Sequence, residues 1–171
     1  MVCYLYTKIP FRFCPQLWKK MELIAGKPVQ QEYNAALGAV LDKVVEKTSR
    51  SREDTALVLL RLLGEEGTVV MEAPAATMTR PLIHERETSF DIVVEETVVA
   101  SAQCLEEALL LFGVAHYVFN QKVSRASRST MWFIVHDIMG LPAVNSDGGR
   151  AEKSVGADSI VCPSSEAAAS L

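Results

Sequence analysis

With 49% apolar and 22% charged residues, this chain of 171 residues is too apolar and too weakly charged to be disordered throughout. It is long enough to bury one ordinary hydrophobic core without disulfide bonds. Its 17 basic and 21 acidic residues give a net charge of −4, which argues against a protein whose main task is to neutralise a phosphate backbone.

Three helices are predicted in the first part of the chain. Apolar residues recur at helical spacing over residues 15–25, and the Gly-Lys-Pro sequence that follows them ends the helix. Residues 29–47 carry an apolar stripe with charged residues mostly opposite it, which is typical of an amphipathic helix. Ser51 opens a third helix over residues 52–63, and Gly64 closes that helix as its C-cap.

Three β-prone runs follow the predicted helices. Residues 68–72 are short and β-branched, and they predict a strand. Residues 73–81 show no periodicity and predict a flexible connection. Residues 90–94 and 97–100 are separated only by two glutamates, a spacing that predicts a hairpin. Two glutamates are poor turn residues because neither favours a positive φ, so a single longer, bulged strand is the alternative.

The most apolar segment of the chain, residues 104–119, predicts a helix that Ser101 caps. A helix that is apolar on all sides is normally buried, so we expect this helix to be central. Cys104, at its start, is expected to be buried and unreactive. A basic, polar connection over residues 120–129 then leads to a last helix over residues 130–139, which a Gly-Leu-Pro sequence ends.

These elements predict a predominantly helical α+β fold of about five helices with a small antiparallel β element. They form a single domain of residues 1–142. Residues 143–171 are rich in Ser, Ala and Gly, and we expect this tail to be disordered because it buries too little apolar surface to offset its ordering entropy.

A resemblance to known proteins covers residues 90–142. The segment reads as a hairpin (FDIVVEETVVAS), a very apolar helix ending in Asn (EEALLLFGVAHYVFN) and an amphipathic helix (STMWFIVHDIMGL). This order is similar to the C-terminal end of a group of uncharacterised fish proteins labelled sterile alpha motif domain-containing protein 3-like. Where those proteins carry Tyr-Pro after the Asn, this chain has Gln121-Lys122-Val123. The resemblance implies a mobile-element origin and a longer family architecture of which this chain is a fragment, but no particular reaction.

The three histidines are His84, His116 and His136, and none of them lies in a catalytic motif. His84 falls in a predicted loop, and His116 is expected to be a hydrogen-bonded residue of the core. His136 precedes Asp137, but neighbouring residues on a helix point about 100° apart, so we expect no dyad. The sequence contains neither a nucleophile motif nor a glycine-rich phosphate loop. We therefore expect no enzyme and no catalytic, cofactor-binding or metal-binding residue.

The cysteines and the paired glutamates add no catalytic or metal chemistry. The four cysteines form no C-x-x-C pair of the kind that holds zinc, and they are Cys3, Cys14, Cys104 and Cys162. Each glutamate pair is expected in a solvated turn or at the start of a helix, and the pairs are Glu65-Glu66, Glu95-Glu96 and Glu106-Glu107.

Two basic segments are the only features that suggest a binding surface. The first twenty residues interleave cations with aromatic residues, and these cations are Lys8, Arg12, Lys19 and Lys20. The second segment contains Lys122, Arg125 and Arg128. Both could contact nucleic acid. A basophilic kinase could also read Ser127 or Ser129, where a phosphate would lie at the start of the last helix.

The sequence favours an intracellular binding protein. Lys8 and Arg12 interrupt any N-terminal signal sequence, and no segment is long enough to cross a membrane. The absence of an Asn-x-Ser/Thr glycosylation site agrees with a life in the cytoplasm or nucleus. We expect a non-enzymatic protein–protein interaction domain that binds a protein partner or associates with itself. A nucleic-acid-associated remnant of a mobile-element protein is the alternative.

Overall fold

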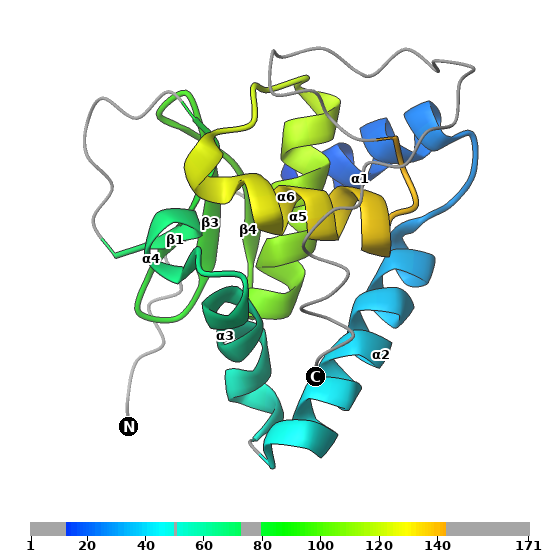
Figure 1. The fold of residues 1–171 in the computed structure, drawn as a ribbon. Coiled ribbons are helices and arrows are strands. Elements are labelled where there is room, and N and C mark those ends of the chain that lie inside the picture. The colour runs from blue at the N-terminus through cyan, green and yellow to red at the C-terminus, as the bar shows by residue number, and fades with distance from the viewer. Residues whose placement is uncertain (1–12, 50, 73–79, 143–171) are drawn as a thin grey trace, which may run out of the picture.

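The computed structural model describes residues 13–49, 51–72 and 80–142. The predominantly helical α+β fold is confirmed: Figure 1 shows a small sheet beside α5, with α6 crossing α5 and with α2 and α3 below them. In chain order the elements are α1 (Phe13–Ala25), α2 (Gln30–Thr48), α3 (Arg52–Leu62), α4 (Glu66–Val69), β1 (Val70–Met71), β2 (Leu82–Glu85), β3 (Phe90–Val94), β4 (Thr97–Ala102), α5 (Leu105–Val118), the 3₁₀ turn η1 (Arg125–Ser127), α6 (Arg128–Trp132) and the π-helix η2 (Phe133–Ile138).

The first three helices form where the sequence predicts them. α1 begins two residues before the predicted start and packs against α5 and β4. α2 buries one stripe of side chains at the helical spacing, and these are Tyr33, Leu37, Leu41 and Val44. The C-cap of α3 is Leu63 rather than the predicted Gly64, which follows it and takes a left-handed φ of 72° that costs a glycine little.

The hairpin of β3 and β4 is confirmed, and its turn has an unusual composition. Glu95 and Glu96 take φ values of 48° and 65°, so both adopt the positive φ that a two-residue type I′ turn needs. The strand register shifts between Ile92 and Val93, which marks a bulge within the hairpin. The structure therefore contains the predicted hairpin rather than a single longer strand. It also contains a bulge, which the sequence had suggested only for the single strand.

The sheet is larger than the predicted hairpin. Its order is β1-β2-β3-β4, with β1 parallel to β2 and the other neighbours antiparallel. β2 was not predicted, because four residues that end in His84 and Glu85 carry no clear strand pattern. The predicted strand over 68–72 is confirmed only at Val70–Met71, because residues 66–69 instead form the short helix α4.

The core is centred on α5, which packs against β2, β3 and β4. Every residue from 108 to 117 is buried, so the predicted central helix is confirmed. Its cap was predicted wrongly: Ser101 belongs to β4, and Cys104 is the N-cap. α6 continues into η2, and Gly113 of α5 lets η2 approach closely, since a Cβ built there would lie 2.4 Å from Cγ2 of Ile134.

Part of the sequence-based interpretation lies outside the described residues. This holds for the tail over 143–171, for most of the connection over 73–81, and for Lys8 and Arg12 of the first basic segment.

Candidate functional site

The histidines lie in three separate environments. His84 is on β2 rather than in the predicted loop, and its Nε2 lies 3.0 Å from the carbonyl oxygen of Glu72. His116 is fully buried in α5, as predicted for a core residue. His136 is exposed on η2. The fold therefore does not combine the histidines into one site.

His116 is held as a neutral imidazole. Its Nδ1 lies 3.0 Å from the carbonyl oxygen of Phe112 and donates to it, because a carbonyl only accepts. Burial lowers the pKa of His116 to about 4; the hydrogen bond to Phe112 opposes that shift, and the positive charge of Arg80 adds to it. Nε2 is buried with no hydrogen-bond partner among the described residues. This ring is a structural group rather than a base that reaches substrate.

His136 and Asp137 are hydrogen-bonded to each other, which corrects the expectation that these neighbours form no dyad. Nδ1 of His136 lies 2.7 Å from Oδ1 of Asp137, and the imidazole stacks on the indole of Trp132 with ring centroids 4.7 Å apart. The 100° separation applies to the Cα–Cβ directions of a regular α-helix. Here the backbone is a π-helix and both side chains extend far enough beyond Cβ to meet. The pair lies at the surface with no described nucleophile at hydrogen-bond distance.

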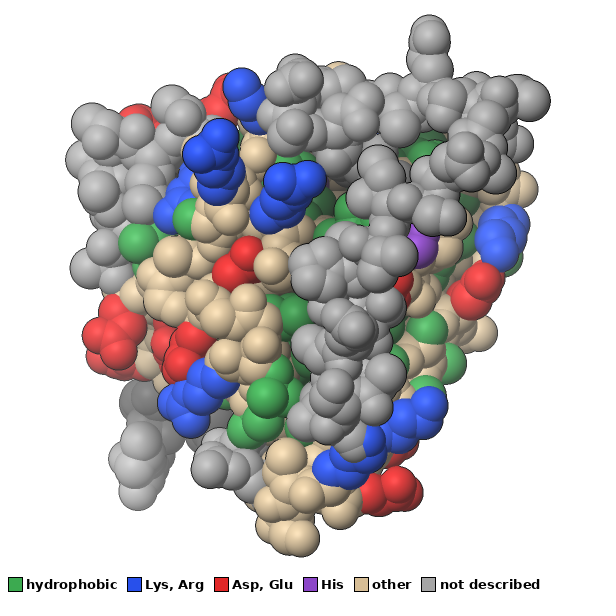
Figure 2. Space-filling view, in the orientation of Figure 1, with side chains coloured by type: hydrophobic (Ala, Val, Ile, Leu, Met, Phe, Trp, Pro, Cys, Tyr) green, Lys and Arg blue, Asp and Glu red, His purple; other side chains and the backbone are tan. Residues whose placement is uncertain are grey.

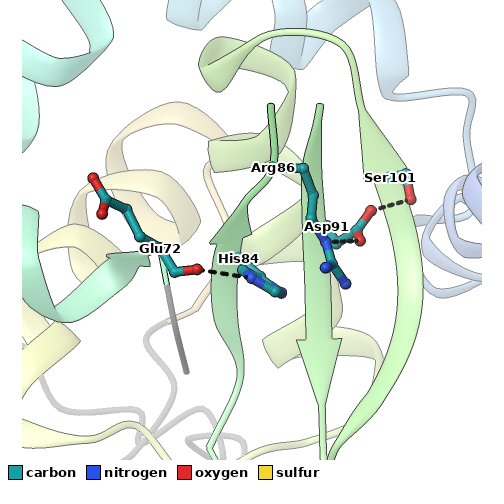
Figure 3. A network of polar contacts seen from close by, with 5 residues as sticks. All are labelled: Glu72, His84, Arg86, Asp91 and Ser101. Carbon is teal, nitrogen blue, oxygen red and sulfur yellow. Dashed lines mark hydrogen bonds and ion pairs between the residues drawn. The ribbon is translucent and has the colours of Figure 1, made fainter. Parts of the chain in front are cut away.

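A row of polar residues crosses the sheet on one face (Figure 3). Asp91 pairs across the strands with His84 on one side and with Ser101 on the other. The hydroxyl of Ser101 donates to Oδ1 of Asp91 at 2.6 Å, and Nε of Arg86 donates to Oδ2 at 3.0 Å. These two contacts compensate the nearly complete burial of the Asp91 carboxylate.

This row does not form a catalytic triad. In a triad the imidazole lies between the hydroxyl and the carboxylate, so that it takes the hydroxyl proton. Here the carboxylate of Asp91 lies next to the hydroxyl, and the imidazole of His84 contacts a backbone carbonyl instead. The contacts of Asp91 join β3 to β4 and to the residue that follows β2, and they leave the hydroxyl of Ser101 with no imidazole to take its proton.

Glu65 is a buried capping residue, which corrects the prediction of a solvated glutamate pair. Its side-chain oxygens accept the backbone N–H groups of Ser129 and Thr130 at 2.8 Å each, from more than 60 positions away. Glu65 is only 7% exposed. The carboxylate therefore satisfies two amides at the start of α6, where unpaired N–H groups favour a negative charge. Its neighbour Glu66 does lie at the surface, where a hydrogen bond from Arg61 lowers its pKa.

The second basic segment gains a cation from elsewhere in the chain. Nη1 of Arg80 donates to Oγ of Ser124 at 3.2 Å, across 44 positions. Arg80 thereby joins Lys122, Arg125 and Arg128, and we call these four residues the basic cluster. Figure 2 shows Lys and Arg side chains gathered at the upper left of the molecule, over η1 and the start of α6. Nothing in the sequence near Arg80 indicated that this residue lies beside Ser124.

Only the end of the first basic segment is described, and that part lies on α1. Lys19 and Lys20 are exposed on this helix. Nζ of Lys20 lies 5.6 Å from the centroid of the Phe119 ring, at the C-terminal end of α5. Lys20 is thus already in contact with an aromatic ring of the chain itself.

Cys104 is exposed, so the prediction of a buried thiol was wrong. The apolar run from which the prediction came begins one residue later, at Leu105. As the N-cap, Cys104 takes an extended backbone conformation outside the first turn and outside the packed part of α5.

The described part of the chain brings no three His, Cys, Asp or Glu side chains together into a metal site. Among the same residues, no helix has the length and apolar character that crossing a bilayer requires. Comparisons of the sequence with protein-family models and with curated proteins, and of the structure with solved structures, find no match.

Proposed function

We propose that the chain is a non-enzymatic, intracellular protein-interaction domain whose basic cluster binds an acidic segment of a partner protein. The observation that carries the proposal is the hydrogen bond from Arg80 to Ser124, which adds a fourth cation to the three within residues 122–128. Several cations gathered on one surface attract an acidic partner and suppress basic ones.

The cations of the basic cluster are available to a partner. Lys122, Arg125 and Arg128 are exposed, and none of them forms an ion pair with a carboxylate of the described residues. Arg61 and Arg86, by contrast, are each paired with a carboxylate. The carboxylate of Glu65 lies close by at the start of α6, but its oxygens already accept two backbone amides.

A nucleic-acid-associated remnant of a mobile-element protein is the second candidate, because the same cations would also hold phosphates. The net charge of −4 favours the protein partner, since a long phosphate backbone would meet repulsion from the rest of the surface. The resemblance of residues 90–142 to the fish proteins stays a prediction, and it concerns only the evolutionary origin of the chain.

We propose that the chain has no catalytic activity because the hydroxyl of Ser101 donates its hydrogen bond to Asp91 rather than to an imidazole.

Fluorescence anisotropy with a labelled peptide of alternating Glu and Leu tests the proposal. We expect the full chain to bind this peptide and not a peptide of the same length with Lys in place of Glu. The double variant R125E/R128E should bind about tenfold more weakly, because each exposed ion pair contributes about 0.2–1 kcal/mol and two are replaced by repulsion.

The matched control is K43E/K47E, which makes the same change of charge on exposed residues of α2. We expect this control to bind the acidic peptide as the unmodified chain does. Equal losses in the two double variants would show a general charge effect and contradict the proposed surface. Tighter binding to a single-stranded oligonucleotide than to the peptide, with a steep salt dependence, would favour the nucleic-acid alternative.

A further inference from the structure

The basic segment contains three serines, and the structure distinguishes them as targets of a kinase. Ser127 is 1% exposed, so its hydroxyl is closed to an enzyme. Ser129 donates its amide to the carboxylate of Glu65, so a phosphate on Ser129 would lie beside a negative charge. The structure therefore disfavours phosphorylation of Ser127 and Ser129, the two serines that the sequence suggested as targets of a basophilic kinase.

Ser124 has the opposite surroundings. It is partly exposed, and its backbone is extended with φ −68° and ψ 147°. Its Oγ accepts two hydrogen bonds of 3.2 Å, from Nη1 of Arg80 and from the amide of Ala126. Lys122 and Arg125 lie within two positions of it in the sequence. A guanidinium and a backbone amide therefore already converge on the oxygen that would carry a phosphate.

We propose that Ser124 is a phosphorylation site for a basophilic serine kinase, and that its phosphate closes the basic cluster to an acidic partner. The kinase would transfer the γ-phosphoryl group of ATP, so that the bond from Oγ to phosphorus forms as the bond to the bridging oxygen of ADP breaks. The hydroxyl proton leaves to the base of the kinase. The second half of this inference, the closing of the cluster, rests on the proposed function.

The physical reason is charge. A phosphate carries about −1.5 to −2 charges and three acceptor oxygens, and Arg80 already points a donor at this oxygen. The phosphate would neutralise about half of the positive charge of the basic cluster. The remaining positive charge would then attract an acidic segment more weakly.

The first test asks whether the folded chain is modified at this residue. The full chain is incubated with ATP and a protein kinase C catalytic domain, a kinase that accepts basic residues on both sides of a serine, and the phosphate is mapped by mass spectrometry. We expect phosphate on Ser124 and its loss in Ser124→Ala. Phosphate on Ser127 or Ser129 instead, or no phosphate on Ser124 of the folded chain, overturns the assignment.

The second test reads the contact with Arg80 directly. Phosphoserine is incorporated at position 124 of the full chain by genetic encoding, and the second pKa of the phosphate is followed by phosphorus NMR. We expect this pKa below the value of about 6 that is ordinary for phosphoserine, because the guanidinium favours the dianion. Arg80→Gln should raise it again. The same pKa in both proteins overturns the contact.

The third test measures the consequence for binding. The chain with phosphoserine at position 124 should bind the acidic peptide about tenfold more weakly. The matched control carries phosphoserine at Ser49, an exposed residue at the end of α2. An equal effect at both positions, or none at 124, overturns the regulatory role. Failure of the unmodified chain to bind the peptide would contradict the proposed function, while the first two tests would still decide the modification site.

Discussion

Gly113 of α5 leaves no room for a side chain beside Ile134 of η2, and replacing it with alanine tests the packing of the core. The added Cβ would lie 2.4 Å from Cγ2 of Ile134 and 3.2 Å from Cε of Met139. Ordinary carbon contacts are about 3.5–4.0 Å, so the first atom must move. Ile134 is fully buried and β-branched, and its side chain has one preferred rotamer in a helix. The Cγ2 methyl group therefore cannot move away from the added Cβ by a change of rotamer.

The free energy of unfolding is expected to fall by about 1–2 kcal/mol in Gly113→Ala. Overpacking a core costs about 1–3 kcal/mol, and the better helix propensity of alanine returns up to about 1 kcal/mol. The control is Gly67→Ala, where an added Cβ meets nothing within 4 Å and stability should hold or rise slightly. Urea denaturation followed by tryptophan fluorescence gives both values as shifts of the midpoint.

A double variant separates this contact from other causes. Ile134→Leu removes the methyl group at Cγ2 and keeps the volume of the side chain, so Gly113→Ala should cost less in its presence. The reasoning would be refuted if Gly113→Ala stabilised the chain as Gly67→Ala does, or if the two changes were simply additive.

Three other changes have expected outcomes. Glu65→Ala should lower the free energy of unfolding by about 2–3 kcal/mol because two amides of α6 lose a charged acceptor, whereas Glu66→Ala should leave the urea midpoint nearly unchanged; equal midpoints would contradict the capping role. The pKa of His116 is about 4 in the folded chain and about 6.5 unfolded, so folding excludes a proton that the unfolded chain binds. The free energy of unfolding should therefore fall by about 3 kcal/mol as the pH falls from 6.5 to 4. Urea titrations across this pH range should show this fall in the unmodified chain, and His116→Gln should lack the contribution of the histidine to it. Cys104 should react with a thiol reagent at the rate of an exposed cysteine when the other three cysteines are replaced by serine. Slow labelling would contradict its exposure and indicate a buried thiol.

Elements that depend on local pattern were predictable from the sequence. The apolar stripe of α2 and the glycine after α3 depend only on residues within a few positions of each other, so periodicity and turn chemistry were sufficient. The burial of α5 followed from its apolar residues on every side, which no solvent-facing helix carries. The hairpin was predictable from the spacing of its strands, in spite of the two glutamates that must adopt a positive φ.

Contacts between distant segments were decided only by the tertiary structure. β2 has too few residues for a strand pattern and is held by its pairing with β1 and β3. Glu65 looked like a surface residue until the start of α6 supplied two amides to its carboxylate. Arg80 enters the basic cluster through one hydrogen bond to Ser124. The residues of β1 pair with residues of β2 that lie 13 positions further along the chain, and the polar contacts of Glu65 and Arg80 span more than forty positions. The path of the chain, rather than any local preference, brings these groups together.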